Sequence, residues 1–104
     1  MQIYADRHAL HRIPELGRDL PETLAYLRAS LSGLRCKLLE PMPGALCAWF
    51  DFGRESAIAF RADIDALPIA EQTGAPYASI HPGKMHACGH DGHAAIVLEL
   101  ARRL

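Results

Sequence analysis

Leucines recur along residues 20–34 at alternating spacings of four and three, which is the repeat of one face of an amphipathic helix. Pro21 suits the first turn of such a helix, Asp19 is a candidate N-cap, and Gly33 lies near its end. We therefore expect a helix whose buried face is a leucine stripe made of Leu20, Leu24, Leu27, Leu31 and Leu34.

Two other segments have helical patterns. Residues 3–13 are expected to form a short helix that Pro14 must stop, because proline lacks a backbone donor and clashes with the preceding turn. Residues 94–104 are apolar at most positions, and their charged side chains, Glu99, Arg102 and Arg103, occupy a narrow stripe. This last segment is predicted to be a mostly buried helix.

Short apolar runs between these helices are typical of strands. They cover residues 36–39, 45–50 and 57–62, and the last two are placed to form a hairpin. Each run is apolar at consecutive positions, so we expect a sheet covered on both faces, with Trp49 in the core and Cys36 and Cys47 as buried thiols.

The segment 63–83 has no periodicity and carries Pro68, Gly74, Pro76 and Pro82, which predicts a long loop. The order of helices and strands predicts the α/β fold class. No internal repeat or linker divides the chain, so residues 1–104 are expected to belong to one domain.

Composition excludes several functional classes. Half of the 104 residues are apolar, which excludes a disordered chain. Eleven basic and twelve acidic side chains nearly cancel, so we expect neither nucleic acid nor a membrane surface as partner. The sequence has no signal peptide and no apolar run near the ~20 residues of a membrane span, and its three cysteines suit a reducing compartment. We therefore expect a cytoplasmic location.

Residues 85–93 place one thiol, three imidazoles and one carboxylate within nine positions. Cys88 and His90 are strong ligands for zinc-like ions, and Gly89 between them permits a sharp turn. Spacing alone equally allows a buried cysteine beside a helix-capping histidine. A redox role for Cys88 is disfavoured because no second cysteine lies nearby. A metal ion of this kind needs about four ligands, so this pair would supply only half of a metal site.

The neighbouring polar residues have simpler interpretations. Asp91 is expected to cap the last helix, and His93 to pack or form hydrogen bonds rather than bind metal. His86 precedes the site and could lie directly behind its ligands, but a lone histidine in a loop is more often solvated or capping, so it receives no role. His11 is expected to end the first helix and to form local hydrogen bonds.

Asp63 and Asp65 stand two positions apart and would share one face of a strand. Two close carboxylates can form an acid–base pair. A salt bridge to Arg61 together with a turn cap is an equally good interpretation of Asp65, so only Asp63 is given a functional role.

Three motifs together resemble a known family. They are His11-Arg12-Ile13-Pro14-Glu15-Leu16, Phe60-Arg61-Ala62-Asp63-Ile64-Asp65-Ala66-Leu67-Pro68-Ile69 and Met85-His86-Ala87-Cys88-Gly89-His90-Asp91-Gly92-His93. In this order they resemble the dinuclear-metal amidohydrolases, a group within the aminoacylase and carboxypeptidase-like metallopeptidases that includes hippurate hydrolase, N-acyl-amino-acid deacylases and auxin-conjugate hydrolases. The resemblance implies the N-terminal portion of a three-layer α/β/α catalytic domain with a mixed sheet, without the inserted lid domain.

The resemblance also implies chemistry. Cys88 and His90 would be metal ligands, and Asp63 would orient a ligand or the base, since the Arg61 cation cannot bind metal. Two divalent ions, manganese or zinc with nickel or cobalt as alternatives, would serve hydrolysis of an N-acyl amino acid or related amide. A homodimer is possible for a full-length family member.

The general base and the remaining ligands of the family have no counterpart among these residues, which contain no Glu-Glu pair. The isolated chain is therefore expected to be an inactive N-terminal fragment of an amidohydrolase. The alternative is a non-catalytic truncated remnant that binds metal weakly or assembles with a separately encoded remainder.

Overall fold

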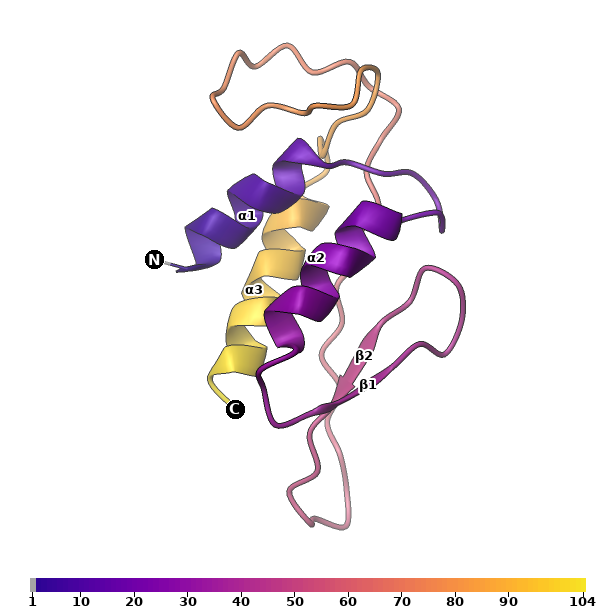
Figure 1. The fold of residues 1–104 in the computed structure, drawn as a ribbon, viewed down its shortest axis with the longest axis vertical. Helices are drawn as coiled ribbons and strands as arrows, with labels where there is room; N and C mark the ends of the chain where they lie inside the picture. The colour runs from indigo at the N-terminus through magenta and orange to yellow at the C-terminus, as the bar shows by residue number, and fades with distance from the viewer. Residues whose placement is uncertain (1) are drawn as a thin grey trace.

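The computed structural model describes residues 2–104. Three helices, α1 (Gln2–Arg12), α2 (Pro21–Leu31) and α3 (His90–Arg102), pack together and account for most of the regular structure. A single antiparallel pair, β1 (Lys37–Leu39) and β2 (Cys47–Trp49), lies beside the lower end of α2 (Figure 1). The predicted α/β class is confirmed, and none of the described helices is long and apolar enough to cross a membrane.

The predicted leucine stripe is buried from Leu20 to Leu31, whereas Leu34 lies beyond the end of α2 and is only partly buried. Leu10 of α1, Leu27 and Leu31 of α2, and Leu98 of α3 are buried and form one cluster with Ala94. Each buried leucine is worth about 1.5–3 kcal/mol of apolar burial, so these contacts hold the helices together.

The N-terminus of α2 is capped by Glu15 rather than by Asp19. The Glu15 carboxylate accepts hydrogen bonds from the backbone N–H groups of Thr23 at 2.8 Å and Glu22 at 3.1 Å. Asp19 is exposed, and no side-chain cap comes from the N-cap residue Leu20. The prediction of Asp19 was wrong because the capping carboxylate belongs to Glu15, six residues before the first residue of the helix.

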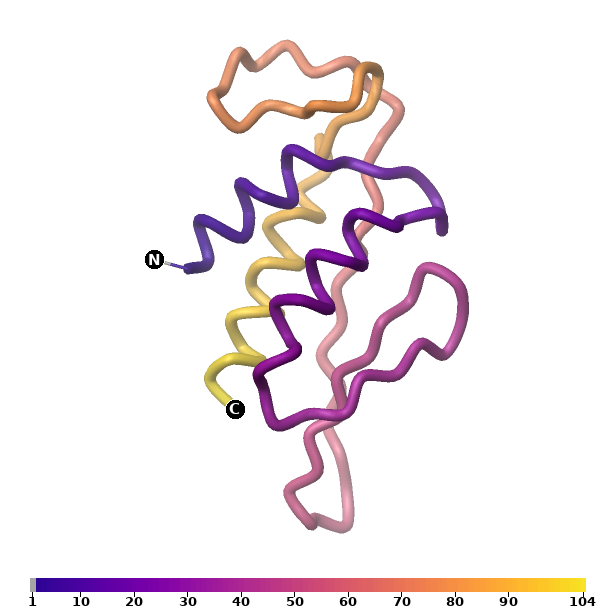
Figure 2. The backbone as a smooth tube through the Cα atoms, in the orientation of Figure 1, coloured from indigo at the N-terminus to yellow at the C-terminus, as the bar shows by residue number. Residues whose placement is uncertain are grey.

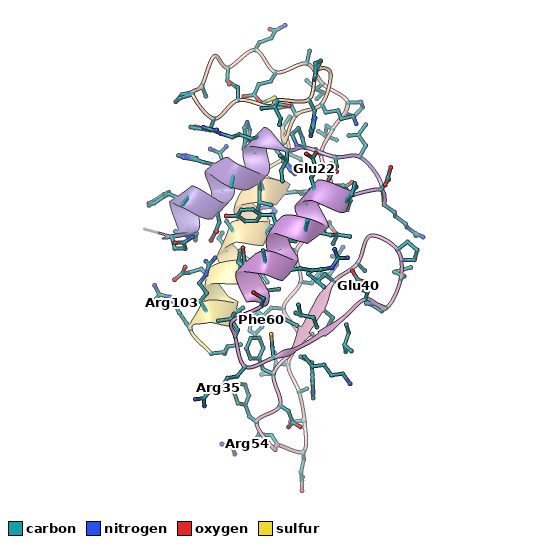
Figure 3. The ribbon with its side chains drawn as sticks, in the orientation of Figure 1. Glu22, Arg35, Glu40, Arg54, Phe60 and Arg103 are labelled. Atoms are coloured by element: carbon teal, nitrogen blue, oxygen red, sulfur yellow. The ribbon has the colours of Figure 1, made fainter. Side chains whose placement is uncertain are left out.

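The strand predictions need three corrections. The hairpin joins residues 37–39 to 47–49, and residues 57–62 form no strand ladder within the described chain. Instead residues 50–62 extend away from the helices and return (Figure 2), with Arg54 near the far tip and Phe60 on the returning arm (Figure 3). Trp49 is 44% exposed and Cys47 is also exposed, so one face of the pair is open rather than covered.

The turn between the two strands depends on Gly44, which adopts φ +80°. A Cβ at this position would lie 2.7 Å from the backbone oxygen of Arg18, a contact that no side chain tolerates. The glycine therefore lets this turn approach the segment before α2 closely.

The predicted helix at residues 94–104 begins four residues earlier, at His90, and Ile96 is 57% exposed. Its predicted burial is therefore correct only on the side that carries Ala94, Ala95 and Leu98. The predicted long loop at residues 63–83 contains no helix or strand apart from one bridge between Leu67 and Met85.

A buried ionic network joins all three helices away from the loop. The Asp6 carboxylate is fully buried and accepts a bidentate bond from Arg102, at 2.6 and 3.1 Å, and one from the Tyr26 hydroxyl at 2.7 Å. Burial would raise the pKa of Asp6, but the bonds from Arg102 and Tyr26 outweigh it and lower that pKa. Burial and the neighbouring Asp6 raise the pKa of Tyr26 to about 12, so its hydroxyl remains a donor.

We expect Asp6→Asn to lower the free energy of unfolding at pH 7 by about 2 kcal/mol, because Arg102 then loses its buried partner. Folding lowers the pKa of Asp6 below its ordinary value of 3.8. The ionised carboxylate therefore adds to the free energy of unfolding above pH 3.8, and this stabilisation is lost as the pH falls through the pKa of the folded state. Urea unfolding at pH 7 and near pH 3 measures this difference. Asp19→Asn on the exposed surface is the matched control, and an equal effect of the two variants at pH 7 would contradict the network's role.

Candidate metal centre

The turn carrying Cys88 and His90 lies directly before α3 and is built around Gly89. This glycine is the N-cap of α3 with φ +98°, in the left-handed region, and the His93 N–H donates to its carbonyl at 3.0 Å. The bridge between Leu67 and Met85, with N–O distances of 2.9 and 3.0 Å, holds the preceding segment beside residues 64–67. The sharp turn expected between the two candidate ligands is confirmed.

The ring of His90 is oriented by Asp65. Its Nδ1 lies 2.8 Å from the Asp65 carbonyl oxygen and 3.1 Å from the Asp65 Oδ1. A carbonyl oxygen can only accept a hydrogen bond, so the proton belongs on Nδ1. The lone pair on Nε2 is then available for a metal ion, which is the usual arrangement of metal-binding histidines.

Cys88 is exposed and lines a pocket of about 410 Å³ between α1, the loop and the turn before α3. A thiol and an imidazole nitrogen fit zinc-like ions, so the residue types suit the expected metal. Across residues 2–104, however, no group of three or more Cys, His, Asp or Glu side chains is placed to hold an ion. The described residues therefore offer two candidate metal ligands, Cys88 and His90, and not a complete site.

The two aspartates of the middle motif separate in the structure. Asp63 pairs with the exposed guanidinium of Arg61, and none of the described hydrogen bonds joins it to Cys88 or His90. Asp65 provides the contact with His90 instead, and it does not pair with Arg61. The orienting role that the family resemblance implied for Asp63 therefore fits Asp65 better. The two carboxylates are only two positions apart, and tertiary placement decides which of them meets His90.

Asp91 does not cap α3, contrary to expectation. Its side chain is 1% exposed, and its Oδ2 accepts hydrogen bonds from His11 Nδ1 at 2.7 Å and Arg7 Nε at 3.0 Å. Its other oxygen has no partner among the described residues. The carboxylate beside the candidate ligand thus connects the start of α3 to α1.

His11 makes long-range bonds rather than the expected local ones. Its Nε2 lies 3.1 Å from both carboxylate oxygens of Glu71, on the long loop. Burial would raise the pKa of Glu71, but hydrogen bonds from Thr73, the Ser79 N–H and His11 outweigh it and lower that pKa. Arg7, His11, Asp91 and Glu71 form a polar cluster, named here the His11 cluster, with two potential cations and two anions. No local sequence pattern predicts this cluster, because its two carboxylates lie 60 and 80 positions from His11.

Aromatic contacts close the same side of the pocket. Tyr77 of the loop stacks on His8 of α1 with ring centroids 3.9 Å apart, and the Arg7 guanidinium lies 5.1 Å from the Tyr77 ring centroid. A backbone bond from Ile80 N–H to the Arg12 carbonyl, at 2.9 Å, adds a further attachment. The loop is thus fixed on α1, at the end of the molecule where α3 begins (Figure 1).

The two remaining histidines of the motif differ from each other. His86 is 4% exposed, and neither ring nitrogen has a partner among the described residues, so the expectation of a solvated or capping residue was wrong. Burial lowers its pKa, against the opposing effect of Asp91. His93 is exposed, with its ring centroid 6.0 Å from that of His90. Its predicted packing role is limited to this contact.

Comparisons with known proteins agree with the family resemblance of the three motifs. Residues 59–104 match the peptidase family M20/M25/M40. The chain is 41% identical to an N-acetyldiaminopimelate deacetylase of Streptococcus suis, a match that covers 100% of the chain and 29% of the relative. It is 48% identical to an N-acetyl-L-cysteine deacetylase of Bacillus subtilis, covering 96% of the chain and 24% of the relative.

A solved structure supports the same assignment. The fold matches the crystal structure of a Bacillus subtilis dinuclear metal binding peptidase from the M20 family with a TM-score of 0.83 and 41% identity. The match covers 98% of this chain and 31% of that protein. The chain therefore spans less than a third of the length of these proteins. The resemblance inferred from the three motifs is confirmed: over residues 59–104 the chain matches the M20/M25/M40 peptidases, and over nearly its whole length it is similar to a part of the deacetylases and of the dinuclear metal binding peptidase.

Proposed function

We propose that this chain supplies two ligands, Cys88 and His90, to the divalent-metal centre of an amidohydrolase that removes the acyl group from N-acyl amino acids. The observation that carries the proposal is the Nδ1 bond of His90 to Asp65, which leaves Nε2 free two residues after the exposed thiol of Cys88. The two deacetylases that the chain resembles are both named for an acetyl group on the nitrogen of an amino acid, which supports this substrate class.

The residues present would divide the work as follows. Cys88 would bind as a thiolate and His90 through Nε2, while Asp65 keeps the imidazole in the required tautomer. Two divalent ions, zinc or manganese with nickel or cobalt as alternatives, would polarise the amide carbonyl and lower the pKa of water. A carboxylate base from outside these residues would move the proton to the leaving amine, giving an acyl acid and a free amino acid.

The metal ligands can be tested on the chain itself. We expect zinc to shift the NMR signals of the Cys88 and His90 side chains, and Cys88→Ala to weaken zinc binding at least tenfold because the thiolate is lost. His93→Ala is the matched control, since His93 is exposed and lies beside the site without binding. A titration in which His93→Ala weakens binding as much as Cys88→Ala would contradict this ligand assignment.

The orienting carboxylate can be distinguished by a matched pair of substitutions. Asp65→Ala is expected to weaken zinc binding about tenfold, at the low end of the range for such partners because the Asp65 carbonyl still holds His90. Asp63→Ala should change the affinity less than twofold, since Asp63 contacts Arg61 instead. The reverse order in calorimetric titrations would restore the role to Asp63.

Activity separates the proposal from a non-catalytic remnant. The 104-residue chain, loaded with zinc or manganese, should release no amino acid from N-acetyldiaminopimelate or N-acetylcysteine above a Cys88→Ala control. If the coding sequence continues beyond Leu104 to a Glu-Glu pair, the complete product should hydrolyse at least one such substrate, and Cys88→Ala should abolish this. A complete product that binds zinc but hydrolyses no N-acyl amino acid would refute the proposed function.

A further inference from the structure

We propose that His11 is a positioning residue for the Cys88–His90 pair: it fixes the turn that carries both ligands through Asp91, and the pocket wall through Glu71. This inference rests on the proposed metal centre. His11 lies on α1, far from the motif in sequence, and touches neither candidate ligand in the described contacts.

The bond to Asp91 is the first step. Asp91 follows His90 directly in the chain and lies in the first turn of α3. With its carboxylate held by His11 at 2.7 Å and by Arg7 at 3.0 Å, the backbone on the C-terminal side of His90 is fixed against α1. The ring of His90 is held separately by Asp65, which belongs to another segment of the chain. His90 is therefore fixed both through its backbone and through its ring.

The bond to Glu71 is the second step. Glu71 is 5% exposed in its side chain and also accepts from the Ser79 N–H at 2.9 Å, so it organises residues 71–79 of the loop. Thr73, Ala75 and Tyr77 of that stretch line the pocket that contains Cys88. One imidazole therefore connects α1, the pocket wall and the ligand-bearing turn.

Burial of the Asp91 and Glu71 carboxylates against His11 indicates a positioning role rather than simple cohesion between the segments. The side chains of His11, Asp91 and Glu71 are all at most 5% exposed. Removing such charges from water is costly, and apolar side chains of similar volume would hold the segments together at least as well. Hydrogen-bonded charges instead impose one orientation, because each ring nitrogen of His11 meets one specific carboxylate.

Two substitutions separate the two bonds of His11. In His11→Asn the amide nitrogen can replace Nδ1 and keep the donor to Asp91, whereas in His11→Gln it can replace Nε2 and keep the donor to Glu71. Each variant loses one buried bond, so their thermal stabilities should be similar. His81→Asn and His81→Gln are matched controls, since His81 pairs with Glu22 near the surface.

The first readout needs no metal. Hydrogen exchange at the His93 amide reports on the turn, because that N–H closes onto the Gly89 carbonyl, and the Arg103 amide is an internal reference at the other end of α3. We expect His11→Gln to accelerate exchange at His93 relative to Arg103, and His11→Asn to leave this ratio close to that of the parent chain. Equal ratios in the two variants would overturn the proposal.

The second readout is a zinc titration followed at His90. His11→Gln should weaken binding about tenfold, as for other partners that hold a ligand in place, while His11→Asn stays within about twofold of the parent. If the loss of zinc affinity in each variant instead tracks the drop in its melting temperature, His11 has a merely structural role and the proposal is overturned. If His11→Gln does not fold, Asp91→Asn and Glu71→Gln provide the same comparison, with only Asp91→Asn expected to accelerate exchange at His93.

The outcomes also separate this inference from the proposed function. A parent chain whose His90 does not respond to zinc contradicts the proposed metal centre, while the exchange ratios still decide the role of His11. Zinc binding that Cys88→Ala abolishes, but that both His11 variants retain, leaves the metal centre intact and refutes the positioning role.

Discussion

The buried carboxylate of Asp91 is the interaction on which the candidate site depends. It lies one residue after His90 and is held by two side chains of α1, so the start of α3 cannot rotate without breaking both bonds. The apolar contacts of Leu10, Leu27 and Leu98 bring the helices together but tolerate small rotations. Directional bonds at Asp91 supply the orientation that a metal ligand needs.

Local sequence signals predicted the elements that local physics controls. The leucine stripe of α2 and the turn at Gly89 follow from periodicity and from backbone freedom, and both are confirmed. Capping of α2 could not be predicted in the same way. Asp19 has the right residue type and lies two positions before Pro21. The free N–H groups of α2 nevertheless bind Glu15, because the chain turns at residues 17–18 and brings Glu15 back to the helix.

Features that depend on contacts between distant segments were missed or misassigned. The His11 cluster joins positions 60 and 80 residues apart, and no pattern within a window of the sequence records such a pairing. The apolar runs predicted a covered sheet, but Trp49 is 44% exposed and Ile58 84% exposed in the described residues. Apolar runs indicate a covered sheet only where a second layer packs on them, and within residues 2–104 no such layer covers these side chains.

The partners of each ring nitrogen separate histidines that look alike in the sequence. His90 gives Nδ1 to a carbonyl oxygen and keeps Nε2 free, so it can bind metal. His11 has both nitrogens against carboxylates and has none left for an ion. His86 has no partner among the described residues, and burial lowers its pKa, which favours the neutral ring. The distinction between ligand and positioning residue therefore lies in hydrogen-bond partners, which residue type and spacing alone do not specify.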